Sequence, residues 1–188
     1  MTRFAFEDRV RPDAKDVVAR LVAAGFAVEL LSGDQAPVAR QVAQDCGIAR
    51  WQAGATPADK IARLQVLSAE GRKVLMVGDG LNDAPALAAG HASLSPASAA
   101  DVSQVAADGV FQGERLAPIL ECIAVARATR SMALQNFAIA IGYNVVFVPL
   151  AMAGLVTPLL AAIAMSASSI AVTVNAVRLR GKKLELSR

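Results

Sequence analysis

The sequence predicts an α/β domain with a mainly parallel sheet, followed by a hairpin of two membrane-spanning helices. Short apolar runs of strand length alternate with helical patterns through about the first two thirds of the chain, which is typical of a parallel sheet covered by helices. The stretch 137–177 then contains no Asp, Glu, Lys or Arg. Basic residues flank that stretch on both sides, with Arg127 and Arg130 before it and Arg178 and Arg180 after it.

The first expected elements are a helix, a strand and a second helix. Residues 12–24 carry a proline at the start and apolar residues at helical spacing, and Gly25 ends the pattern. The apolar run 27–31 ends in Ser32-Gly33-Asp34, which indicates a buried strand that leads into a polar loop. A second helix is expected over about residues 36–46.

Further strands and helices are expected to follow in alternation. They are a strand at 51–53, a helix opened by Thr56-Pro57 that runs to about 70, a strand at 74–77, a helix at 81–89, a strand at 92–94, a helix at 97–106 and a strand at 110–111. The strand at 74–77 also ends in a Gly-Asp loop. Because ligands gather at the carboxyl ends of parallel strands, we expect Ser32, Asp34, Asp79 and Asp83 to converge there.

The apolar region divides at residues 154–158 into two segments of about 20 residues. At roughly 1.5 Å per residue, each can cross a hydrocarbon core of about 30 Å. Positive charge on both flanks places both ends of the hairpin in the cytoplasm. The expected organisation is a cytoplasmic domain at 1–125, a hairpin at 126–180 with helices at about 133–156 and 158–178, and a cytoplasmic tail at 181–188, in a plasma or inner membrane.

Composition excludes several other classes. The net charge is +3, and the basic residues form no stripe interleaved with aromatic residues, so no nucleic-acid partner is expected. Cys46 and Cys122 lie far apart and form no C-x-x-C pair, so neither a disulfide framework nor a zinc site is indicated, and both are expected to be packed thiols in a reducing compartment. His91 and Trp51 are expected to be ordinary surface or packed residues. The first ten residues contain no apolar run of signal length, so no cleaved targeting peptide is expected.

The most informative string is Met-Val-Gly-Asp-Gly-Leu-Asn-Asp-Ala-Pro-Ala-Leu at residues 76–87. Its two carboxylates, Asp79 and Asp83, stand four residues apart at the mouth of a strand and offer the oxygen ligands that Mg²⁺ prefers. Gly80 lets the backbone approach a phosphate, and Asn82 offers an amide donor. On spacing alone, the same string could be a helix-capping turn with solvated acids.

This string resembles the hinge motif of the P-type ATPases at every fixed position, Gly-Asp-Gly-x-Asn-Asp-Ala-Pro-Ala-Leu. Further matches occur in the order of that family. They are Phe6-Glu7-Asp8, Arg11-Pro12, Ser32-Gly33-Asp34, and Thr56-Pro57 with Lys60. The resemblance implies a phosphorylation domain of the haloacid dehalogenase-like type, which uses ATP and Mg²⁺.

The resemblance assigns roles to the loop after the first strand and to the third helix. Ser32, beside Gly33, would donate a hydrogen bond to the transferred phosphoryl group. Lys60 would neutralise charge on that group, and Asp34 would contact the nucleotide ribose. The family usually has Thr in place of Ser32, and Ser keeps the hydroxyl.

The resemblance likewise assigns roles to the Gly-Asp-Gly loop. Asp79 would hold Mg²⁺, Asn82 and Asp83 would order the phosphate and the metal shell, and Gly80 would line the cofactor site. The segment 95–102 departs from the family, because it lacks the usual Gly-x-Gly-Thr-Asp-Val. This departure resembles the branch of copper pumps that serve assembly of respiratory oxidases.

The choice of metal depends on the hairpin. Copper-class members carry Tyr-Asn and Met-x-x-Ser-Ser in these two helices, and this chain has Tyr143-Asn144 and Met165 with Ser168 and Ser169. A thioether is a soft ligand suited to Cu⁺, and residues at i, i+3 and i+4 share a helix face. These residues are therefore expected to contact transported copper. Alternatively, the polar residues join helices while Met165 packs.

The resemblance covers about the last quarter of a full-length pump. The phosphorylated Asp-Lys-Thr-Gly-Thr segment, the nucleotide-binding and actuator domains and the Cys-Pro-Cys helix of the family are not in this sequence. In the family the nucleophile strand lies between the strands that end here at Leu31 and Val77. Two unpaired strand edges, and low stability of residues 1–125 alone, are therefore expected.

We expect the chain to be part of an ATP-driven copper transporter that is inactive by itself. Its expected partners are the membrane, ATP, the metal ion, the remainder of the pump on the same or a separate chain, and a copper chaperone. One alternative is a non-catalytic membrane fragment or partner that docks on an intact pump. A membrane-tethered hydrolase of the same superfamily is disfavoured, because no Asp-x-Asp or Asp-Lys-Thr motif precedes the strand of Ser32.

Overall fold

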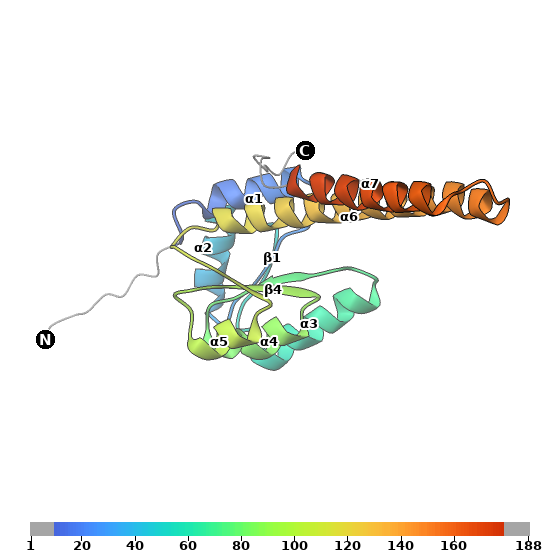
Figure 1. The fold of residues 1–188 in the computed structure, drawn as a ribbon. Coiled ribbons are helices and arrows are strands. Elements are labelled where there is room, and N and C mark those ends of the chain that lie inside the picture. Colours follow the sequence, from blue (N-terminus) through green and yellow to red (C-terminus); the bar gives the residue numbers. More distant parts are fainter. Residues whose placement is uncertain (1–9, 179–188) are drawn as a thin grey trace, which may run out of the picture. The chain divides into compact units, whose positions relative to one another are not determined.

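The computed structural model describes residues 10–178. The chain divides into two units, Met1–Leu120 and Glu121–Glu185, which are described separately (Figure 1). The first unit contains the α/β elements, and the second contains most of the helical hairpin.

The first unit alternates short strands and helices. Its elements are α1 (Ala14–Ala23), β1 (Glu29–Leu31), α2 (Ala36–Cys46), β2 (Arg50–Gln52), α3 (Pro57–Ala69), β3 (Leu75–Val77), a 3₁₀ turn η1 (Leu81–Asp83), α4 (Ala84–Ala89), β4 (Ala92–Pro96), α5 (Asp101–Ala106) and β5 (Gly109–Phe111). Local sequence explains the element ends. Gly47 ends α2 at φ 74°, and Thr56 begins α3 through a capping box with Asp59. The predicted α/β fold is confirmed.

The five described strands form two sheets, and the strands within each sheet pair in parallel. β1 pairs with β2, with Leu30 opposite Trp51, and β3, β4 and β5 pair in that order, with Met76 opposite Ser93. Among the described residues no strand joins β1 to β3, so each has an edge without a ladder partner. This arrangement differs from a continuous sheet and agrees with the expected pair of open edges.

A small apolar core holds α1 against α2. Ala14, Val18 and Cys46 are buried there, with partly buried Val28, Val42, Ile48 and Leu116 around them. Burial, assisted by the neighbouring Asp45 carboxylate, raises the pKa of the Cys46 thiol, which therefore stays protonated. Cys46 is a packed thiol, as expected, whereas Cys122 is exposed.

The start of α6 (Ala117–Met152) is capped by a side chain from the beginning of α1. The Asp13 carboxylate accepts hydrogen bonds from the backbone N–H groups of Leu116 and Ala117, at 2.9–3.0 Å. Burial alone would raise the pKa of Asp13, but these donors and nearby Arg115 outweigh it and hold the pKa below the ordinary value of 3.8. Asp13 therefore serves as an N-cap supplied across about a hundred residues of sequence.

Replacing this cap should destabilise the first unit. Asp13→Ala is expected to cost about 1 kcal/mol of unfolding free energy, as for other helix caps, measured by urea unfolding in detergent. Folding lowers the pKa of Asp13, so its carboxylate contributes to the unfolding free energy at pH values above its unfolded-state pKa. That contribution is lost as the pH falls through the folded-state pKa of Asp13. An equal loss in the exposed control Asp45→Ala, or a cost that does not shrink in acid, would contradict this role.

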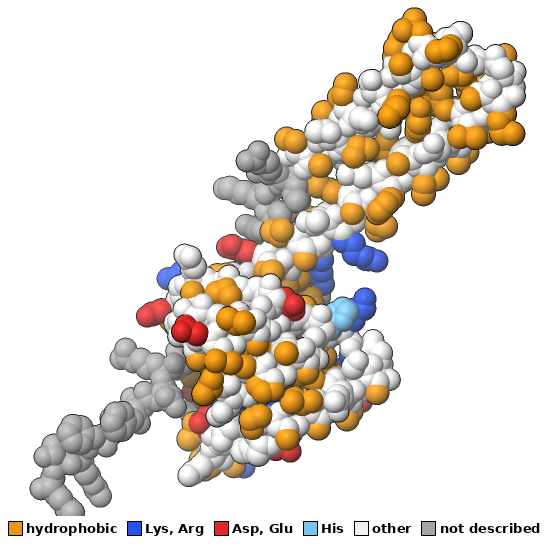
Figure 2. Space-filling model, turned by 60° about the horizontal axis from the view of Figure 1, so that its bottom comes forward, with side chains coloured by type: hydrophobic (Ala, Val, Ile, Leu, Met, Phe, Trp, Pro, Cys, Tyr) orange, Lys and Arg blue, Asp and Glu red, His pale blue; other side chains and the backbone are white. Residues whose placement is uncertain are grey.

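The hairpin consists of α6 and α7 (Pro158–Val177), and each helix is long and apolar enough to cross a membrane by length and composition. α6 begins earlier than the expected residue 133, because its first half contains good helix formers and Pro118 lies in its first turn, whereas Pro149 stands inside the helix near its end. It ends at Met152, before Gly154 at φ 74°. Hydrophobic side chains dominate the visible face of the hairpin's far part in Figure 2.

Half-buried side chains at three- and four-residue spacing mark the seam between α6 and α7. They are Met132, Asn136, Ala140, Tyr143 and Phe147 on α6, and Ala164, Ser168, Val172 and Asn175 on α7. Asn175 is 8% exposed and donates a 2.9 Å hydrogen bond to the amide oxygen of Asn136. Such a polar pair fixes the register of two helices that otherwise offer each other apolar surface.

Candidate functional site

The loop after β1 is held in place by backbone hydrogen bonds to the loop after β2. The N–H of Ser32 donates to the carbonyl of Gln52 at 2.9 Å, and the N–H of Ala55 donates to the carbonyl of Ser32 at 2.8 Å. The Ser32 hydroxyl donates to the Asp34 carboxylate at 2.6 Å and accepts from the Asp34 N–H at 3.1 Å. Gly33 and Asp34 are exposed, so this loop presents a hydroxyl and a carboxylate to solvent.

A buried ion pair stands beside the loop after β3. The ammonium group of Lys60, on α3, donates to the carboxylate of Asp83. Their side chains are 9% and 14% exposed. A Cβ on Gly78 would lie 2.8 Å from the Cβ of Asp83, so the loop approaches Asp83 in a way that only glycine permits.

Asp79 is the open carboxylate of this loop. Its side chain is 66% exposed, and its carboxylate lies 3.6 Å from the guanidinium group of Arg11. No cluster of three or more His, Cys, Asp or Glu occurs within residues 10–178. Mg²⁺ is usually held by one or two carboxylates together with water and phosphate oxygens, so an open Asp79 beside Asp83 fits that ion.

The start of α5 and the residue before it hold the Gly-Asp-Gly loop through two hydrogen bonds. Ser103, on α5, is fully buried, and its hydroxyl donates to the carbonyl of Gly80 at 2.6 Å. The N–H of Ala100 lies 3.4 Å from the carbonyl of Asp79. These contacts hold the two consecutive carbonyl groups that follow the Asp79 side chain along the chain.

Loss of the Ser103 hydroxyl should loosen this loop. Ser103→Ala leaves a buried carbonyl without its donor, and we expect a loss of about 1–3 kcal/mol in unfolding free energy. Urea unfolding of the full chain in detergent measures it, with exposed Ser98→Ala as the matched control. A Ser103 variant as stable as the Ser98 variant would show that the hydroxyl does not hold the loop.

The hairpin residues singled out by the sequence lie on two faces. Tyr143 and Ser168 are half-buried on the seam, and the Tyr143 ring stacks on Phe147 with centroids 4.8 Å apart. Met165, at 67% exposure, and Asn144 and Ser169 face away from the seam. The Asn144 amide donates to the carbonyl of Ala140 at 2.8 Å, which satisfies one donor within the helix.

Known proteins match the sequence of both units. Residues 2–91 match the family of haloacid dehalogenase-like hydrolases. The chain is 53% identical over 181 residues to nitrogen fixation protein FixI of Rhizobium leguminosarum bv. viciae, and 40% identical over 176 residues to probable copper-exporting P-type ATPase V of Mycobacterium tuberculosis (strain CDC 1551 / Oshkosh). These matches cover 96% and 94% of this chain.

A solved structure covers both units as well. A zinc-transporting PIB-type ATPase in its E2.Pi state matches 92% of this chain with a TM-score of 0.87 and 33% identity. The chain is a homologue of the heavy-metal P-type ATPases. It spans about a quarter of the length of these relatives, namely 24% and 23% of the two curated proteins and 28% of the solved chain. The resemblance expected from the motifs is confirmed.

The structure assembles part of the P-type ATPase site that the sequence predicts. It brings Lys60, Asp83 and the Gly-Asp-Gly loop together. Asn82 lies exposed on η1. No hydrogen bond or ion pair among the described residues joins the Ser32 loop to Asp79 or Asp83, so their convergence stays a prediction.

The contact of Arg11 with Asp79 was not predicted. The Arg11-Pro12 motif was noted in the sequence, but nothing in the sequence indicates that Arg11 contacts Asp79, 68 positions away. It places a fixed positive charge at the open carboxylate.

Proposed function

We propose that the chain forms part of an ATP-driven heavy-metal pump and that copper is its cargo. The observation that carries this proposal is the buried Lys60–Asp83 pair beside the open carboxylate of Asp79, on a unit that continues into a charge-free hairpin. Phosphoryl-transfer sites combine a fixed lysine, a carboxylate that can hold Mg²⁺ and a backbone loop that approaches the phosphate. The homology to P-type ATPases supports the same reading.

Each residue has a task in phosphoryl transfer. Asp79 would hold Mg²⁺ with the help of Asp83, and that ion would neutralise charge on the phosphoryl group. Lys60, fixed by Asp83, would hold its ammonium group where negative charge develops. The Ser32 hydroxyl would exchange its hydrogen bond with Asp34 for one to a phosphate oxygen. Asp34 would then be released to contact the nucleotide.

The acceptor of the phosphoryl group would come from the remainder of the pump, on the same or a separate chain. β1 and β3 belong to two separate parallel sheets, and each has one edge without a ladder partner among the described residues. An extended segment between them would complete one sheet and would end near both polar loops, because the carboxyl ends of parallel strands meet at one sheet edge. Such a segment can supply the acceptor carboxylate.

The hairpin would supply part of the transport pathway. Met165 is exposed, and its thioether is a soft ligand that suits Cu⁺. Asn144 and Ser169 are also exposed, while Tyr143 and Ser168 line the seam. Exposed polar groups at this depth are costly in lipid, so other helices of the pump, with further metal ligands, would cover this face. The α/β unit would stand in the cytoplasm.

A second candidate function is a non-catalytic membrane partner that docks on an intact pump. The open edges of β1 and β3 favour it, since a docking chain also requires an unpaired edge. The mass of the native polypeptide distinguishes the two. An antibody raised against residues 10–120 detects the native polypeptide in membranes. The pump proposal predicts either a species several times heavier than 19.4 kDa, or a 19.4 kDa species that co-purifies with a chain carrying the phosphate acceptor. A 19.4 kDa species bound to a pump that is already complete would support the second candidate.

A further inference from the structure

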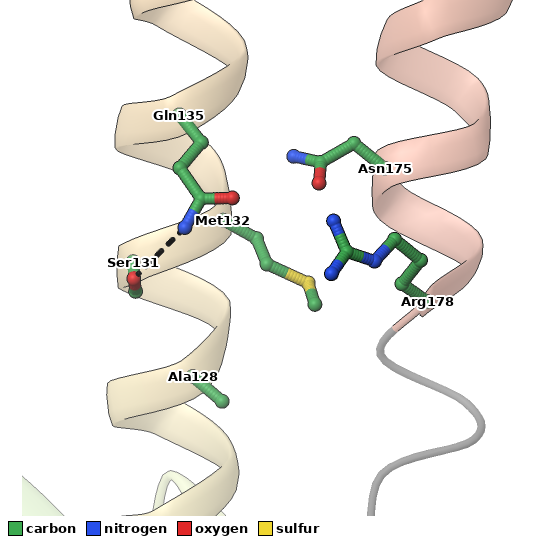
Figure 3. A pocket seen from close by; sticks show the side chains of 6 residues that line it. All are labelled: Ala128, Ser131, Met132, Gln135, Asn175 and Arg178. Carbon is green, nitrogen blue, oxygen red and sulfur yellow. Dashed lines mark hydrogen bonds between the residues drawn. The ribbon is translucent and has the colours of Figure 1, made fainter.

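A polar pocket lies between α6 and α7, at the end of the hairpin where the chain enters and leaves it (Figure 3). Its volume is about 100 Å³. It is lined by Ala128, Ser131, Met132, Gln135, Asn175 and Arg178. Figure 3 shows the guanidinium group of Arg178 and the amide groups of Gln135 and Asn175 directed into the space between the helices.

The pocket is strongly biased towards anions. Arg178 has no ion-pair partner among the residues that the structure describes, and the sequence from 122 to 184 contains no Asp or Glu. Arg127 and Arg130 add further positive charge on the same flank of α6. The nearest acids in sequence, Glu121 and Glu185, are both outside this span.

The lining also contains neutral polar groups. The Gln135 amide nitrogen lies 3.5 Å from the Ser131 hydroxyl, a long contact. The Asn175 amide is already committed to Asn136. Figure 3 shows the Gln135 amide oxygen, which is an acceptor, turned into the space and the Gln135 nitrogen turned towards Ser131, so the guanidinium group of Arg178 is the donor that an anion in the pocket would meet.

The pocket stands at the depth where lipid headgroups begin. The charge-free part of α6, from Met132 to Met152, is about 30 Å long at 1.5 Å per residue, the thickness of a hydrocarbon core. The lining residues lie at or just outside the start of that part, and Arg178 directly follows α7. This step depends on the membrane insertion proposed above.

We propose that this pocket binds the phosphate of an anionic phospholipid headgroup. Arg178 would make the charge-assisted contact, for which a guanidinium fork is well suited. The apolar side chains exposed along the hairpin would accommodate the acyl chains. A free phosphate ion has the same headgroup chemistry but no acyl chain, so the depth of the pocket favours the lipid.

Native mass spectrometry of the full chain in detergent tests this proposal, with phosphatidylglycerol or phosphatidylcholine added to the micelles. The wild-type chain should retain one phosphatidylglycerol in preference to phosphatidylcholine. Arg178→Gln should lower that retention about tenfold, as expected for one lost charge-assisted hydrogen bond, and Arg178→Lys should restore part of it. Arg130→Gln, which removes the same charge outside the pocket, should change retention little.

Three outcomes would overturn the proposal. Equal losses in the Arg178 and Arg130 variants would mean that the flank attracts lipid only by its net charge. Equal retention of both lipids would remove the preference for an anionic headgroup. Displacement by millimolar inorganic phosphate would identify a soluble anion as the ligand. Because the readout is lipid retention rather than phosphorylation, such a failure would leave the proposed pump function standing.

Discussion

Asp79→Ala should abolish phosphorylation from ATP in the assembled pump. Asp79 is the open carboxylate of the Gly-Asp-Gly loop, and without it the proposed site would lack its principal Mg²⁺ ligand. Removal of a group that stabilises transferring charge typically costs about 10²–10³ in rate, and loss of the ion's ligand should cost at least that much. The measurement is transfer of radioactive phosphate from γ-labelled ATP to the protein in membranes.

This variant should not disturb the fold, because the Asp79 side chain is 66% exposed and its contact with Arg11 is a partly exposed ion pair. Asp45→Ala, an exposed acid on α2, is the matched control and should keep full phosphorylation. Phosphorylation of the Asp79 variant at the level of the control would remove Asp79 from the site.

Lys60→Ala should also abolish phosphorylation, but it carries a structural cost. The substitution leaves the Asp83 carboxylate largely buried and without its ion-pair partner. Removal of one member of a buried ion pair typically destabilises a protein by about 3–5 kcal/mol. Lys60→Met combined with Asp83→Asn removes both charges, so it should recover most of the stability and none of the phosphorylation. Recovery of phosphorylation in the double variant would mean that the pair has only a structural role.

The second large effect is expected in the hairpin. Met165→Ala should strongly impair the dependence of phosphorylation on copper, because we propose its thioether as the soft ligand that α7 offers to Cu⁺. Met152→Ala is the matched control, since Met152 is also an exposed hairpin methionine, at 85% against 67% for Met165. Neither substitution removes buried packing, so both variants should fold normally.

The copper concentration that half-saturates phosphorylation measures this effect. It should rise about tenfold or more for the Met165 variant, the equivalent of at least about 1.4 kcal/mol of lost binding, and stay unchanged for the Met152 variant. Unchanged copper-dependent phosphorylation in the Met165 variant would remove the transport-site assignment. Because the homologous protein of known structure is a zinc-transporting ATPase, the same titration should be repeated with Zn²⁺.

The sequence predicts the elements of the first unit well because their ends have local causes. Pro57 after a Thr56 cap begins α3, and Gly47 ends α2 in a conformation that other residues rarely adopt. These are interactions within a few residues, so they are visible in the sequence itself. The strand–loop motifs at Ser32 and Asp79 were located for the same reason.

Contacts between distant segments could not be predicted in this way. The Ser103 hydroxyl reaches Gly80 across 23 residues, and Asp13 caps a helix that starts about a hundred residues later. Spacing within α7 likewise does not reveal which side of a helix face contacts the neighbouring helix. Met165 and Ser168 are three residues apart, yet the first is exposed and the second lies on the seam, because a helix face is wider than the contact with one neighbouring helix.

The most direct test is copper-dependent phosphorylation of the native protein. Membranes are labelled with γ-labelled ATP with and without Cu⁺, and the protein is isolated with an antibody against residues 10–120. Radioactive phosphate should appear on the isolated complex only when Mg²⁺ and Cu⁺ are both present, and hydroxylamine, which cleaves acyl phosphates, should release it. A complex that binds the antibody but takes up no phosphate with any heavy-metal ion would contradict the proposed function.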